Sequence, residues 1–137
     1  MQAFCTSVAV LAFGCIAAGC AAVHEADCAQ GEQRSVSDVL YFGTSRAAGT
    51  ITSAQWSGFL RSAVTPRFPE GLTAWPASGQ WRTAGGAVVH EASFVLILVH
   101  PEDDTSENSV RGIIGEYKSR FDQEAVMRVK GHACVSF

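Results

Sequence analysis

The sequence predicts an α+β domain in which four strands alternate with two amphipathic helices. Three observations support this class. Residues 94–99 are apolar at every position and rich in β-branched side chains, which is typical of a buried central strand. Two other segments repeat apolar residues at the spacing of one helical face. Glycine and proline fall between these segments, where turns are expected.

The first strand is expected at residues 36–43, which are rich in β-branched and aromatic side chains and end at Gly43. The first helix has a clear start, because Thr52 and Gln55 form a capping-box pattern. Pro66 ends this helix, since a proline disfavours helical backbone at the residue before it. The apolar face of the helix consists of Trp56, Phe59, Leu60, Ala63 and Val64.

The second strand is expected at residues 71–77 and at a sheet edge, because Pro76 cannot donate a hydrogen bond to a ladder. A hairpin-type turn at residues 84–87 leads to the central strand. The second helix is expected after Pro101, with acidic residues at its start and basic residues near its end, as the helix dipole prefers. Residues 124–129 alternate as a last strand.

This order of elements, βαββαβ, is the split βαβ pattern of a ferredoxin-like fold. The expected sheet is antiparallel and four-stranded, with both helices on one face and the hairpin as an extra feature. Right-handed crossovers place the first and third strands in the centre and the other two at the edges. The composition agrees, because the two most apolar strands are the first and the third.

The composition excludes several kinds of partner. Hydrophobic residues make up 47% of the 137-residue chain and charged residues 17%, which is typical of a single globular domain. The net charge is −3 and the ten Lys and Arg residues form no run, so no nucleic-acid partner is expected. The same acidic balance argues against a polybasic membrane patch.

The N-terminal segment resembles an export signal. It carries no charged side chain up to Val23, and its short apolar run gives way to small residues and then to acidic sequence. This pattern favours a signal peptide at residues 1–19 over a membrane-spanning helix. A tether at residues 20–35 and one domain at residues 36–137 are expected to follow. The chain is therefore expected to be exported to the cell envelope or periplasm.

Residues 16–20 resemble a bacterial lipobox, so Cys20 is expected to carry a lipid that anchors the protein to the membrane. Membrane contact is expected through this anchor alone. Ala17 stands where such motifs usually have leucine, and the positively charged start of a signal is missing. Plain secretion after cleavage and an uncleaved anchor therefore remain as alternatives.

The cysteines predict one disulfide. Two of the five lie in the signal and Cys20 is expected to carry the lipid, which leaves Cys28 and Cys134 as a pair. The first and last strands are expected to be antiparallel neighbours, so both cysteines fall at the same end of the sheet. An oxidising compartment preserves such a bond. There is no C-x-x-C motif and the four histidines lack ligand spacing, so no metal and no cofactor are expected.

Five separated motifs resemble a family of small exported bacterial proteins that is catalogued only as a domain of unknown function. The resemblance covers residues 36–137 and implies an exported, often lipid-anchored, setting without implying an activity. The departures are the weak lipobox and the uncharged N-terminus. The motifs are LYFG at 40–43, TPRFPxGLT at 65–73, GQWR at 79–82, VLILVH at 95–100 and CVSF at 134–137.

A cluster of polar and aromatic residues is the first candidate ligand site. Pro66 and Pro69 stiffen the backbone around Arg67, and a fixed arginine near a tryptophan suits a carboxylate or phosphate ligand. The alternative, which we favour, is a structural ion pair of Arg67 or Arg82 with Glu91. The cluster comprises Arg67, Gln80, Trp81, Arg82 and Glu91.

Tyr41 and His100 are the other candidate ligand-binding residues. Tyr41 projects from the first strand and can act either as a general acid in a cleft or as interface packing with a polar tip. His100 closes the third strand and can be either catalytic or a satisfied surface residue. No serine lies in a nucleophile-elbow context, so no catalytic residue is assigned and an enzyme is not favoured.

The sheet face opposite the helices is expected to need a cover, because its residues are as apolar as those facing the helices. The expected cover is a second copy of the chain, which predicts a homodimer through this face; the alternative is the connection at 66–91 folded back over it. Two functions follow. The favoured one is a binding or interaction module of the cell envelope. The other is a small cofactor-independent enzyme or small-ligand binder between the sheet face and that connection. The residues of this face are Val39, Tyr41, Val95, Ile97 and Val99.

Overall fold

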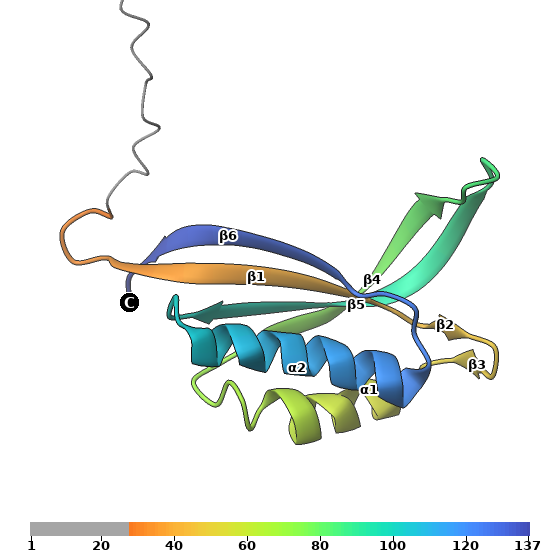
Figure 1. Ribbon diagram of the computed structural model, residues 1–137, viewed down its shortest axis with the longest axis horizontal. Helices are drawn as coiled ribbons and strands as arrows, with labels where there is room; N and C mark the ends of the chain where they lie inside the picture. The colour runs from red at the N-terminus through yellow and green to blue at the C-terminus, as the bar shows by residue number, and fades with distance from the viewer. Residues whose placement is uncertain (1–27) are drawn as a thin grey trace, which may run out of the picture.

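The computed structural model describes residues 28–137, which form a four-stranded sheet with two helices packed on one of its faces, and a separate two-stranded ribbon (Figure 1). The helices are α1 (Ser53–Phe59), which continues into the π-helical turn η1 (Leu60–Val64), and α2 (Asp104–Phe121). The strands are β1 (Gln33–Gly43), β2 (Ser45–Arg46), β3 (Gly49–Thr50), β4 (Thr73–Arg82), β5 (Val88–His100) and β6 (Met127–Val135).

The ferredoxin-like topology predicted from the sequence is confirmed. The four long strands are antiparallel and lie in the order β4-β5-β1-β6, so the first and third strands are central. Even-numbered strand residues face the helices and odd-numbered ones face away. The core between sheet and helices is aromatic at its centre, where Phe42, Trp56, Phe59 and Tyr117 contact one another edge to face or stacked.

Both helices begin as their sequences predict. The Thr52 hydroxyl accepts a hydrogen bond from the Gln55 backbone, and the Gln55 side chain accepts one from the Thr52 backbone. The Asp103 carboxylate caps α2 by accepting from the Ser106 backbone at 2.7 Å. At its C-terminal end α2 is capped by Asp122, which adopts a left-handed backbone conformation with φ of 52°.

Three expected boundaries are corrected. The turn at 84–87 joins β4 and β5 directly, so the expected extra hairpin is the far end of one long β4–β5 ladder. The last strand runs over Met127–Val135 instead of 124–129. The first strand begins at Gln33, inside the expected tether, because Gln33 pairs with Val135 at the C-terminal end of the chain.

The far end of the β4–β5 ladder leaves the sheet. β1 has its last partner on β5 at Ser93, so residues 78–92 pair with each other and have no third strand. Figure 1 shows this segment extending beyond the sheet and turning away from the helices. We call residues 78–92 the projecting arm.

Candidate functional site

The candidate residues predicted from the sequence do not share one cavity within the described residues. Arg67 and His100 border one cavity of about 340 Å³, while Gln80 and Glu91 border a shallow hollow of about 410 Å³ at the base of the projecting arm. Tyr41 lies between Val95 and Met127 on the sheet face that the helices leave open. Trp81 and Arg82 lie on the arm itself and are exposed.

Arg67 is held by an ion pair, as the alternative to the ligand-site hypothesis states, but its partner is not Glu91. Its Nη1 donates to the Ala63 carbonyl at 2.6 Å and to Glu116 Oε2 at 3.0 Å. Glu91 instead accepts a hydrogen bond from the Ser45 backbone at 2.9 Å. Arg67 therefore ties the end of η1 to α2, and Glu91 fixes the chain where it leaves β1.

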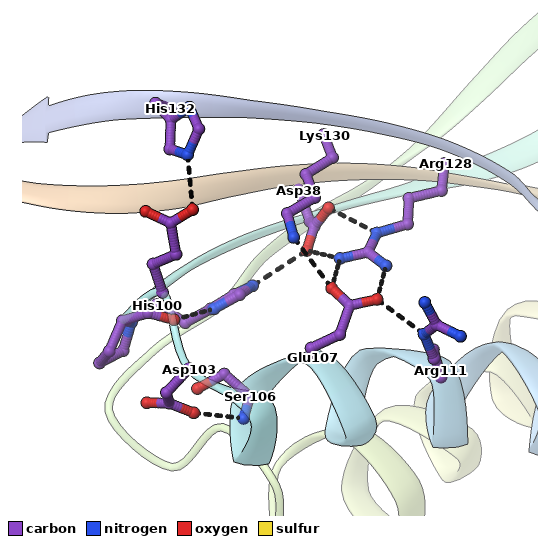
Figure 2. Close-up of polar contacts among 11 residues, drawn as sticks. Asp38, His100, Asp103, Ser106, Glu107, Arg111, Arg128, Lys130 and His132 are labelled. Carbon is purple, nitrogen blue, oxygen red and sulfur yellow. Dashed lines mark hydrogen bonds and ion pairs between the residues drawn. The ribbon is translucent and has the colours of Figure 1, made fainter. Parts of the chain in front are cut away.

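His100 belongs to a buried polar cluster that lies between the sheet and α2 (Figure 2). Its Nε2 is 2.9 Å from Asp38 Oδ2, and its Nδ1 is 2.8 Å from the Pro101 carbonyl oxygen. Both ring nitrogens thus have protein partners, and the side chain is almost fully buried. A general base needs one free nitrogen facing its substrate, so this geometry indicates a structural histidine.

One guanidinium joins the two carboxylates of the cluster. Arg128 donates to both oxygens of Asp38 at 2.7 Å and to both oxygens of Glu107 at 2.8 Å. Such bidentate pairs are the strongest hydrogen-bonded ion pairs that side chains form. Glu107 also accepts from Arg111 at 2.7 Å and from Lys130 at 3.0 Å. The cluster therefore connects the N-terminal half of α2 to β1 and β6.

The pKa values of both carboxyl groups are lowered in this environment. Burial alone would raise the pKa of Asp38, but hydrogen bonds from Arg128 and His100, together with their charge, outweigh it. The hydrogen bond from Arg128, followed by those from Arg111 and Lys130, holds the pKa of Glu107 far below its usual range. Both groups are therefore charged and fully partnered at neutral pH, which is the state of a structural network.

Asp38, Glu107 and Arg128 were not among the candidate residues predicted from the sequence. A signal for Asp38 was available, because it interrupts the inward-facing series of Val36, Leu40 and Phe42. A charged residue at an inward position of a central strand requires a buried partner. Glu107 and Arg128 give no such signal, since neither interrupts an apolar pattern and charged residues are common at such surface positions.

The open face of the sheet is the second feature that calls for an explanation. Tyr41, Val95 and Ile97 lie at its centre. No segment of residues 28–137 covers this face, so the 66–91 connection does not fold over it: that connection forms the edge strand β4 and the arm. The most exposed apolar residues here are Trp75 at 41%, Val99 at 46%, Val129 at 52% and Met127 at 58%.

The open face is almost free of charge. Among the odd-numbered positions of β1, β4, β5 and β6, Glu91 is the one charged residue, and its carboxylate is bound to the Ser45 backbone. The charged residues of these strands otherwise lie on the helix side, as Asp38, Arg128 and Lys130 do. A face this large without charge is typical of an interface between proteins.

Cys28 and Cys134 are joined in a disulfide, as predicted, with their Cα atoms 5.4 Å apart. Within the described residues, one group of potential metal ligands lies close together, and it consists of these two cysteines and Glu32. Sulfur atoms joined in a disulfide are not thiolates and do not hold a metal in this state. The group is therefore best explained by the disulfide itself.

Residues 37–137 match the family DUF3574, whose description is "Protein of unknown function". The chain belongs to this family. The match confirms the resemblance inferred from the five sequence motifs and covers nearly all of the described structure. No curated protein matches the sequence.

Solved structures of low sequence identity share the fold of the DUF3574 domain. A phage SAM lyase in complex with S-methyl-5'-thioadenosine has a TM-score of 0.55 at 13% identity, covering 82% of this chain and 95% of that chain. CutA from Synechococcus elongatus has a TM-score of 0.53 at 11% identity, covering 77% of this chain and 83% of that chain. The structural similarity establishes the ferredoxin-like fold. At identities this low it transfers no activity.

The predicted signal peptide and the lipidation site at Cys20 lie outside the described residues. Among the residues that are described, no helix has the length and hydropathy needed to cross a membrane.

Proposed function

We propose that this DUF3574 protein is an exported interaction module of the cell envelope that works as a homodimer, with the open faces of two sheets packed together. The uncharged, uncovered sheet face carries this proposal. Trp75, Val99, Met127 and Val129 would otherwise keep their apolar side chains in water. Burying apolar surface is the dominant favourable term in most protein association.

The size of the apolar surface fits a dimer. The exposed apolar side chains of the open face and the arm offer on the order of 500 Å² to a partner, since a fully buried aromatic side chain covers roughly 200 Å². A stable interface buries about 800 Å² on each side. Tyr41 and Ile97, which are partly exposed, would add to this area and bring it toward the lower end of the size of stable interfaces.

The lack of charge favours a second copy over a charged partner. The chain has a net charge of −3, so two copies repel each other weakly, and a neutral contact surface adds nothing to that repulsion. A neutral face can meet itself in a two-fold arrangement without placing like charges together. Two sheets packed face to face lie about 10 Å apart, which allows their side chains to interdigitate.

The disulfide supports the exported setting, because such bonds persist in oxidising compartments and are rare in the cytosol. The signal-like segment before Cys20 supports it independently. The alternative function, a small cofactor-independent enzyme or a binder of small carboxylates or phosphates, has weaker support from the structure. The residues chosen for it, Tyr41, Arg67 and Trp81, do not converge on one cavity: Arg67 borders one, and Tyr41 and Trp81 do not line it.

Val129→Glu is expected to weaken the dimer by about a hundredfold, because the two-fold contact would bury two unpaired carboxylates. Sedimentation equilibrium of the purified full chain measures the dissociation constant. Ser57→Glu adds the same charge on the exposed side of α1 and is the matched control, which should dimerise like the wild type. A wild-type chain that stays monomeric at high micromolar concentration would contradict the proposal.

Export and anchoring are tested by mass spectrometry of the protein isolated from its native host. The expected product lacks residues 1–19 and carries a diacylglycerol on Cys20. Cys20→Ala is expected to leave the membrane fraction, since the anchor is lost while the domain is unchanged. A cleaved chain without lipid would indicate plain secretion, and an intact chain beginning at Met1 would contradict export by cleavage.

A further inference from the structure

The projecting arm carries apolar side chains that its own chain leaves uncovered. Trp81 and Val89 are paired across the two strands of the arm, and Trp81 is 54% exposed. An isolated two-stranded hairpin is only marginally stable in water. Their odd numbers place both residues on the same surface as the open face. The arm also turns away from the helices, toward the side where a second copy would lie (Figure 1).

A cavity of about 340 Å³ lies at the opposite end of the same pair of strands. β4 begins opposite Ile97, so Val99 has no β4 neighbour and borders this cavity instead. The connection that follows η1 supplies Arg67, Phe68 and Glu70 to the wall. The first turns of α2 add Ser106 and Ser109, so the wall combines apolar surface with polar groups.

In the proposed dimer, one choice of two-fold axis would bring these two features together. The axis that lies between two face-to-face sheets and runs perpendicular to the strands reverses the strand direction and keeps the β4 edges on the same side. The arm and the cavity lie on that edge, on opposite sides of Val95 along β5. With this axis each arm would lie at the cavity end of the other copy, and the contact would be made twice, as in an isologous dimer.

We infer that in the dimer the indole of Trp81 from each copy occupies the cavity beside Arg67 of the other copy. This inference rests on the proposed homodimer and adds its anchoring contact. Phe68 and Val99 would pack against the ring, and the Arg67 guanidinium would lie over its face. The indole N–H would donate to Glu70 or to a serine hydroxyl. Tryptophan suits this wall because it offers a large apolar body and a single donor.

Trp81→Ala is expected to raise the dimer dissociation constant at least tenfold, because a tryptophan seated in a pocket is a typical interface hot spot. Sedimentation equilibrium of the full chain gives this constant. Arg82→Ala changes the neighbouring residue on the other surface of the arm and is the matched control, expected to leave the constant unchanged. At a concentration low enough to keep the chains monomeric, thermal unfolding of both variants should match the wild type, since both side chains are exposed within one chain.

Cross-linking tests the contact directly. A chain with both Trp81→Cys and Ser109→Cys is expected to form covalent dimers under mild oxidation, while Arg82→Cys with Ser109→Cys is not. If Trp81→Ala keeps the wild-type constant while Val129→Glu is monomeric, the dimer stands and the Trp81 contact is wrong. If the wild-type chain is monomeric, both the dimer and this contact are overturned.

Discussion

Arg128→Met is expected to lower the free energy of unfolding by about 3–5 kcal/mol, because it leaves the carboxylate of Asp38 buried without its main partner. Asp38 is fully buried, and Arg128 donates to both of its oxygens. His100 contributes one further contact and does not replace the guanidinium. Methionine keeps much of the arginine stem's volume, so the lost packing is small compared with the unpaired charge.

Urea denaturation at neutral pH measures this loss, and Lys130→Met is its control. Lys130 lies on the same strand and contacts Glu107 from a more exposed position, where an ion pair contributes less than about 1 kcal/mol. Adding Asp38→Asn to Arg128→Met should recover part of the stability, because the buried charge is then removed. Equal losses in Arg128→Met and Lys130→Met would show that Asp38 does not depend on Arg128.

In the Arg128→Met variant, the contribution of Asp38 to stability should respond to acid in the opposite direction. In the wild type the pKa of Asp38 is lowered, so its contribution to stability is complete above about pH 4, its unfolded pKa. That contribution is lost as the pH falls toward the folded pKa. Without Arg128, burial raises the pKa of Asp38, and protonation then relieves the unpaired charge. The stability gap between wild type and variant should therefore narrow as the pH is lowered from 7 to 3.

The sequence predicts the elements of this fold well because their signals are local. The capping box at Thr52 and Gln55 needs four consecutive residues, and the alternation of β1 needs one strand. The arm was less predictable, because whether β4 ends at residue 77 or continues to Arg82 depends on its pairing with β5. The amino-acid composition of residues 78–82 does not predict whether they pair with β5.

The polar cluster shows where sequence reasoning stops. Arg128 lies opposite Leu40 in the β1–β6 ladder and reaches diagonally to Asp38. A different register of β6 would turn this side chain to the open face or place it beyond reach of Asp38. Glu107 meets the pair because α2 crosses that edge of the sheet. Periodicity locates these elements, and tertiary packing alone sets the distances between their side chains.

The disulfide gives the other large effect. Replacing both Cys28 and Cys134 by serine is expected to cost about 4–5 kcal/mol, because the bond closes a loop with a sequence separation of 106. A cross-link over so long a loop removes much of the conformational freedom of the unfolded chain. The loss should also appear locally. Gln33 and Arg34 pair with Val135 and Cys134, so these strand ends are expected to fray without the bond.

Thermal unfolding with and without a reducing agent measures this effect on the purified chain. The wild type should lose stability on reduction, and the double serine variant should be insensitive to reductant. Hydrogen exchange is expected to rise at Gln33–Ser35 and their β6 partners while the β1–β5 pairs near Leu40 stay protected, because those strands are held by the core. Free thiols at both Cys28 and Cys134 in unreduced protein would contradict the bond. If hydrogen exchange rose evenly along β1, the proposal that the disulfide stabilises one end of the sheet would be contradicted.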